Sequence, residues 1–106
     1  MEKLARQYIN LWNKKDLGSI RSIFSQTIKL IDWESNIKGL GNVIAANKTL
    51  FETVPTIEAS IIDITCKQNK CYLELEIFIN SESQFKVIDV IEVKDGKIDS
   101  INAYKQ

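Results

Sequence analysis

Two acids and a phenol occupy positions where the surrounding pattern predicts the interior of the protein. Tyr8 lies on the apolar stripe of a predicted helix, at helical spacing from leucines and a tryptophan. Asp32 follows two aliphatic residues at strand spacing, and Asp89 lies between Val87 and Ile91 on one face of a predicted strand. A carboxylate that faces an apolar interior costs several kcal/mol unless it is paired, hydrated or protonated. We therefore expect Tyr8, Asp32 and Asp89 to line a cavity that binds a ligand or performs chemistry.

Each of these three residues also has a purely structural interpretation. A buried Asp89 can bond to Tyr8 or to the backbone, and Asp32 at a strand end can be a turn residue or cap. Tyr8 can be a core aromatic whose hydroxyl is satisfied. A single cavity would account for all three at once. Four large aromatic residues could either line the pocket or pack in the core or at a dimer interface. They are Trp12, Trp33, Phe51 and Phe78.

The composition excludes several kinds of site. The chain has no histidine, so a Ser-His or Cys-His nucleophile pair is excluded. Because the chain has no histidine and only two cysteines, we expect no zinc site. Gly39 and Gly41 lack the remainder of any phosphate-binding motif. We expect the protein to need no cofactor.

The two cysteines, Cys66 and Cys71, flank a predicted tight turn at Gln68-Asn69. That register places them opposite each other on a hairpin and permits a disulfide. Cross-strand geometry rarely suits the bond, however, and a cytosolic chain stays reduced. We therefore expect two free structural thiols.

Length and charge indicate one domain over residues 1–106 with a small-molecule partner. The 14 basic and 14 acidic residues cancel, and no basic patch favours nucleic acid. No segment is long and apolar enough for a membrane span or a signal core, so the predicted location is cytoplasmic. A neutral protein self-associates more readily than a charged one. We expect a homodimer that forms through the sheet. Glu74 and Glu76 are predicted on its outer face, where they are either part of a polar dimer surface or exposed to solvent.

The first half of the chain reads as helices around one strand. An amphipathic helix is predicted over residues 2–14, and Asp16 offers an N-cap to a second, short helix. Residues 27–33 alternate as a strand. A third helix follows the glycines at 39 and 41, with Ile44, Leu50, Phe51 and Val54 predicted on its buried side, and ends at Pro55.

The second half reads as a meander of antiparallel strands. Four strands are predicted, over residues 57–66, 71–80, 84–94 and 97 to about 105. Asp95-Gly96 is a strong hairpin signal, and Ile98 and Ile101 break strict alternation, which predicts a bulge. The predicted fold class is therefore α+β, with three N-terminal helices packed on a strongly curved, mostly antiparallel sheet that forms a cone-shaped pocket.

Several segments together resemble the nuclear transport factor 2-like superfamily, which shares the cystatin-like fold. They are Gln7-Tyr8-Ile9, residues 13–17, Ile31-Asp32-Trp33-Glu34, residues 87–92 with 95–98, and residues 100–104. The resemblance covers nearly the whole chain and is strongest to the branch of ketosteroid isomerases and small polyketide cyclases.

This resemblance implies roles for the three polar residues. Tyr8 matches the tyrosine that donates a hydrogen bond to the substrate carbonyl, and Asp32 matches the general base. Asp89 matches the second donor, an aspartic acid that ketosteroid isomerase, the well-known example, keeps protonated in an apolar site. The implied reaction is an intramolecular proton transfer like that of steroid delta-isomerase, on a small apolar carbonyl-bearing ligand.

Three positions depart from the isomerase pattern. Lys48 stands where a supporting tyrosine is common, and it would favour ionisation of Asp89 unless it turns to solvent. Lys105 replaces an apolar or aromatic wall, and Trp33 replaces a proline. The alternatives to an isomerase are therefore a non-catalytic ligand-binding or dimerisation module of the same fold and, third, a cyclase or hydrolase-like activity.

Overall fold

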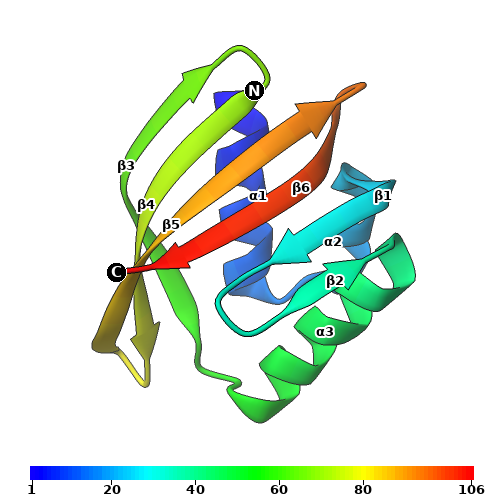
Figure 1. Ribbon diagram of the computed structural model, residues 1–106. Coiled ribbons are helices and arrows are strands. Elements are labelled where there is room, and N and C mark those ends of the chain that lie inside the picture. The colour runs from blue at the N-terminus through cyan, green and yellow to red at the C-terminus, as the bar shows by residue number, and fades with distance from the viewer.

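The computed structural model describes residues 1–106 and begins with two helices joined by a short turn (Figure 1). Helix α1 (Glu2–Lys14) ends at Lys15, which adopts a left-handed φ of 57°. The Asp16 carboxylate accepts a hydrogen bond from the Ser19 amide at 3.1 Å and caps α2 (Leu17–Ile23), as the sequence predicts. The Lys15 ammonium donates a hydrogen bond to the carbonyl of Ile57 at 2.8 Å. This bond connects the turn to the residue that precedes the strand starting at Glu58.

Two strands separate α2 from the third helix. Strand β1 (Phe24–Ile31) begins three residues before the predicted start at 27 and ends two residues before 33, because the chain turns at Asp32. The sequence did not predict β2 (Asn36–Lys38), which pairs antiparallel with the end of β1. Helix α3 (Leu40–Thr53) starts after Gly39, whose φ of 92° favours glycine.

The remaining strands complete a sheet of six. They are β3 (Glu58–Lys67), β4 (Lys70–Ile79), β5 (Glu82–Lys94) and β6 (Lys97–Lys105). The order is β2-β1-β6-β5-β4-β3, in which only the β1–β6 pair is parallel. Figure 1 shows the long strands bending around α1, while α3 crosses near β2. The predicted α+β class with three helices on a curved, mostly antiparallel sheet is confirmed.

The predicted bulge lies in β6. The register with β5 passes from Val93↔Ile98 to Glu92↔Ser100, so Asp99 has no partner on β5. The Asp99 carboxylate instead accepts hydrogen bonds from the hydroxyls of Ser25 at 2.6 Å and Thr27 at 2.7 Å. These bonds hold the pKa of Asp99 below its ordinary value and connect β6 to β1.

The prediction of free thiols is wrong. Cys66 and Cys71 face each other in the predicted register and form a disulfide, with their Cα atoms 4.0 Å apart. Lys67 pairs with Lys70 beside the turn, so the cysteines are the next pair along the hairpin. Antiparallel pairs alternate between wider and closer Cα spacing, and this pair has the close spacing. The tight turn therefore brings the two sulfur atoms together.

Helix α3 buries Phe51, as predicted, together with Val43 and Asn47, which were not predicted to be buried. The other predicted residues, Ile44, Leu50 and Val54, are half-buried and pack against the core. The rest of the core comes from α1 and the inner face of the sheet. Its fully buried large side chains are Phe24, Ile20, Ile28, Leu73, Ile91, Ile98 and Ile101.

The outer face of the sheet is partly apolar. Tyr72 and Tyr104 are 44% and 59% exposed, and Glu74 and Glu76 alternate with buried Leu73 and Leu75. The two glutamates thus point away from the leucine face, as the alternation predicts. The homodimer through this face stays a prediction. None of the three helices has the length and apolar character needed to cross a membrane.

Candidate functional site

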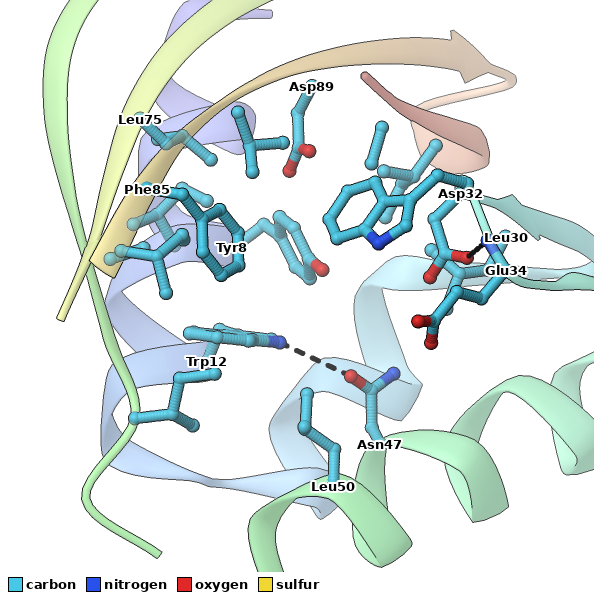
Figure 2. A pocket seen from close by; sticks show the side chains of 18 residues that line it. Tyr8, Trp12, Leu30, Asp32, Glu34, Asn47, Leu50, Leu75, Phe85 and Asp89 are labelled. Atoms are coloured by element: carbon cyan, nitrogen blue, oxygen red, sulfur yellow. Dashed lines mark hydrogen bonds between the residues drawn. The ribbon is translucent and has the colours of Figure 1, made fainter. Parts of the chain in front are cut away.

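A cavity of about 260 Å³ lies between α1, α3 and the inner face of the sheet (Figure 2). Apolar side chains supply 14 of its 18 lining residues, so the few polar groups stand out as the ones that could direct a ligand. Tyr8, Asp32 and Asp89 all line it. The structure therefore brings together the three residues that sequence analysis selected.

Tyr8 reaches the cavity from α1. Its spacing on the helix puts it on the same face as Ala5, Ile9 and Trp12, and only 5% of its surface is exposed. The ring lies against Phe24, with centroids 5.6 Å apart. The hydroxyl makes no hydrogen bond to another protein group and points into the cavity (Figure 2). Burial, and secondarily the charge of Asp89, raise the pKa of Tyr8, so it stays a hydrogen-bond donor at neutral pH.

Asp89 reaches the cavity from the middle of β5. It shares the inner face with Val87 and Ile91 and is 8% exposed. Its register partners are Leu73 on β4 and Ala103 on β6, which offer no polar group from their side chains. The carboxyl makes no hydrogen bond to another protein group. Burial in these surroundings raises the pKa of Asp89 to about 7, so both protonation states are present near neutrality.

Asp32 has the structural role of a turn residue and also lines the cavity. It is half-buried where β1 ends, and one oxygen, Oδ1, accepts hydrogen bonds from the amides of Glu34 at 2.8 Å and Ser35 at 2.7 Å. This Asx turn fixes the carboxylate at the side of the cavity. The second oxygen, Oδ2, makes no hydrogen bond to the protein, so Asp32 keeps one oxygen for a ligand.

Sequence reasoning missed the role of Asn47. Only 4% of Asn47 is exposed, and its Oδ1 accepts a hydrogen bond from the indole Nε1 of Trp12 at 3.2 Å. Its Nδ2 donates to the carbonyl of Val43 at 3.1 Å. The neighbouring Lys48 is exposed, so its side chain does not approach Asp89 from the cavity. The polar residue that α3 contributes to the site is therefore Asn47 rather than Lys48.

Two aromatic residues form the rim of the cavity, and a lysine lies against them without lining the cavity. The rings of Trp33 and Phe85 meet edge to face with centroids 5.8 Å apart. The Lys105 ammonium lies 4.6 Å from the centroid of Phe85 and 5.7 Å from that of Trp33. Of the four aromatic candidates, Trp12 and Trp33 line the cavity, whereas Phe51 and Phe78 do not.

This arrangement suits hydrogen bonding and proton transfer. The phenol of Tyr8 and the carboxyl of Asp89, both without protein partners, face an apolar space, and the carboxylates of Asp32 and Glu34 also line it. No three His, Cys, Asp or Glu side chains gather in the arrangement of a metal site. Two donors aimed at one oxygen can stabilise a developing negative charge, and a carboxylate nearby can accept a proton.

Comparisons with known proteins agree on a family and a fold. The model of the SnoaL-like domain matches residues 5–101. No curated protein matches the chain.

Several solved structures are similar over nearly the whole chain. A candidate polyketide cyclase from Sinorhizobium meliloti is 11% identical, with a TM-score of 0.88 over 97% of this chain and 94% of that chain. A candidate isomerase of the SnoaL-like family from Agrobacterium tumefaciens is 13% identical, with a TM-score of 0.86 over 98% and 95%. A candidate ketosteroid isomerase from Kribbella flavida is 13% identical, with a TM-score of 0.85 over 98% and 76%. At such identities these similarities show the fold alone.

Proposed function

The chain belongs to the SnoaL-like domain family, and from that premise we propose that its cavity binds a small, largely apolar carbonyl compound and moves a proton next to the carbonyl. The fold alone does not select an activity, since one scaffold serves many functions. The proposal therefore depends on the side chains in the cavity. The similar structures named as a candidate isomerase and a candidate cyclase agree with it.

One observation carries the proposal. The hydroxyl of Tyr8 and the carboxyl of Asp89 both face the cavity, and neither has a hydrogen-bond partner in the protein. No fully buried side-chain nitrogen or oxygen lacks a hydrogen-bond partner, so the unpaired oxygens of Tyr8 and Asp89 are open to the cavity, where a ligand can reach them. Two unpaired groups in one apolar space are therefore suited to a shared acceptor, such as a carbonyl oxygen.

The reaction follows from these positions. Tyr8 and protonated Asp89 each donate a hydrogen bond to the carbonyl oxygen of the ligand. The free oxygen of Asp32 removes a proton from the adjacent carbon, and the electron pair of that C–H bond moves to the oxygen as an enolate. Each prearranged donor typically contributes about 3 to 4 kcal/mol to such a transition state. Asp32 then returns the proton to another carbon, so no cofactor or net redox change is needed.

The apolar lining supports the protonation state that this scheme requires. Asp89 must hold its proton to act as a donor, and burial raises its pKa to about 7. An ammonium beside it would favour the ionised form. Lys48 is exposed and Lys105 lies over the aromatic rings of the rim, so neither lysine lines the cavity.

A conjugation assay tests the proposal. A β,γ-unsaturated cyclohexenone is incubated with the protein, and the absorbance of the conjugated isomer is followed. Asp32→Asn should lower kcat by roughly 100-fold or more, because an amide cannot accept the proton. Asp63→Asn is the matched control, since Asp63 is exposed on β3 and outside the cavity. Equal, negligible turnover by the wild type and Asp32→Asn would contradict the catalytic proposal for this ketone.

The second candidate function is ligand binding without turnover. The observation that favours it is the Asx turn, in which Asp32 already accepts two backbone hydrogen bonds through Oδ1. In this case Tyr8 and Asp89 hold a carbonyl ligand, and Asp32 only shapes the rim. A rise in melting temperature with cyclohexenone, without conversion and without sensitivity to Asp32→Asn, would favour this function.

A further inference from the structure

Trp33 lines both the cavity and a second hollow beside it. This outer hollow has a volume of about 310 Å³ and shares Asp32, Trp33 and Ala103 with the cavity. Its other lining residues include Tyr104 and Lys105 at the end of β6. Two spaces that share three lining residues are neighbours, and those residues lie at the boundary between them.

Trp33 is the only large side chain of the three. Ala103 carries a single methyl group, and the Asx turn holds the short side chain of Asp32 in place. The indole packs edge to face with Phe85, with ring centroids 5.8 Å apart, and the Lys105 ammonium lies 5.7 Å from its centroid. The indole is thus the one large side chain that lines both spaces, and we call it the wall between the cavity and the outer hollow.

The Trp33 side chain lies at the surface of the protein and is not part of the buried core. Trp33 is 47% exposed and is absent from the buried core cluster. It follows β1 in a bend, outside any helix or strand. Removing its side chain should therefore change the shape of the site without removing a core contact.

We propose that Trp33 determines the length of the ligand that the cavity accepts. This inference rests on the proposed function, because it assumes that the ligand enters with its carbonyl toward Tyr8 and Asp89. A volume of about 260 Å³ is below the range of roughly 300 to 1,000 Å³ that accommodates drug-sized ligands. The wild-type ligand is therefore a carbonyl compound of one or two rings. Joined to the outer hollow of about 310 Å³, the space would fall inside that range.

Two aryl ketones of matched chemistry test the wall. Acetylnaphthalene has two fused rings and acetylpyrene has four, and each carries the same methyl ketone. Dissociation constants are measured by calorimetry for the wild type and for Trp33→Ala. The wild type should prefer acetylnaphthalene by about tenfold or more, and Trp33→Ala should bind acetylpyrene about tenfold more tightly than the wild type does.

Two further variants separate the wall from general loosening of the rim. Trp33→Phe keeps a ring between the two spaces and should retain most of the wild-type preference. Tyr104→Ala enlarges only the outer hollow, because Tyr104 does not line the cavity, and should leave the preference unchanged. A ratio of the two constants that is the same in Trp33→Ala and the wild type would overturn the proposal.

The outcome is distinct from that of the conjugation assay. A shift in ketone preference without any turnover would support the wall and contradict the catalytic function. Turnover that depends on Asp32, with no shift in preference, would support the function and overturn the wall. Failure of both ketones to bind either protein would overturn the wall and the carbonyl ligand together.

Discussion

The indole of Trp12 donates a hydrogen bond to the side-chain oxygen of Asn47 at 3.2 Å and so joins α1 to α3 beside the cavity. Both residues are buried, and both line the cavity. The second polar group of Asn47 is bound to the carbonyl of Val43, one helical turn earlier. The helices on either side of the site are therefore connected by one buried polar contact.

Asn47→Ala should destabilise the protein by roughly 1 to 3 kcal/mol. The substitution leaves the Nε1–H of Trp12 without a partner in a buried place, and the cost is that of an unsatisfied donor. Urea unfolding measures the change, with Lys48→Ala as the control because the neighbouring lysine is exposed. Equal stability of Asn47→Ala and Lys48→Ala would show that the contact contributes nothing.

Tyr8→Phe should separate stability from function. The hydroxyl bonds to no protein group, so its loss should change the free energy of unfolding by no more than about 0.5 kcal/mol. Turnover of the cyclohexenone should fall roughly 100-fold, because one donor to the developing oxyanion is gone. A large loss of stability with unchanged turnover would mean that Tyr8 is an ordinary core residue.

Asp89→Asn should change how stability depends on pH. The folded pKa of about 7 lies above the ordinary 3.8, so the native carboxyl holds its proton more tightly than the unfolded one does. The stability from that proton is fully present below pH 3.8 and is lost as the pH rises to about 7. Between these pH values the free energy of unfolding of the wild type should fall, relative to that of Asp89→Asn, by up to about 1.4 kcal/mol per pH unit. Above about pH 7 the difference between the two proteins should stay constant. Urea unfolding of both proteins from pH 4 to pH 9 measures the difference. Parallel curves would show that Asp89 titrates normally.

The Cys66–Cys71 disulfide should be detectable in solution. Alkylation with iodoacetamide under denaturing conditions should label no thiol without reductant and two thiols after reduction. Because the closed loop is short, reduction should lower the free energy of unfolding by only about 2 kcal/mol. Complete labelling of the oxidised sample would restore the sequence prediction of free thiols.

Periodicity predicted the placement of two buried site residues, Tyr8 and Asp89. Tyr8 follows the apolar stripe of a long helix, and Asp89 alternates with Val87 and Ile91 in a long strand. In both elements many apolar residues define which face is buried, so a single polar residue on that face does not change the prediction. The same reasoning predicted the helices, the four long strands and the bulge in β6.

Features that depend on contacts across the fold could not be predicted this way. Asn47 lies at helical spacing from buried Val43 and Phe51, but its partner, Trp12, is on another helix, and no pattern within α3 reveals that partner. Strand β2 has three residues and is defined only by its pairing with β1. The disulfide was misjudged because the expected reducing compartment and the rarity of suitable cross-strand geometry were given more weight than the predicted register, which was correct. The position of Trp33 depends on the bend after β1, and the alternation of apolar and polar residues in a strand does not predict the direction of that bend.

The pH dependence of kcat/KM for the cyclohexenone tests most directly whether Asp89 acts as a protonated donor. This parameter follows the pKa values of the free protein, and burial raises that of Asp89 to about 7. We predict that kcat/KM falls about tenfold per pH unit above about pH 7 and that Asp89→Asn, whose amide still donates, loses this fall. A wild-type kcat/KM that rises through pH 7 would contradict the account, because it would make Asp89 the base instead of the donor.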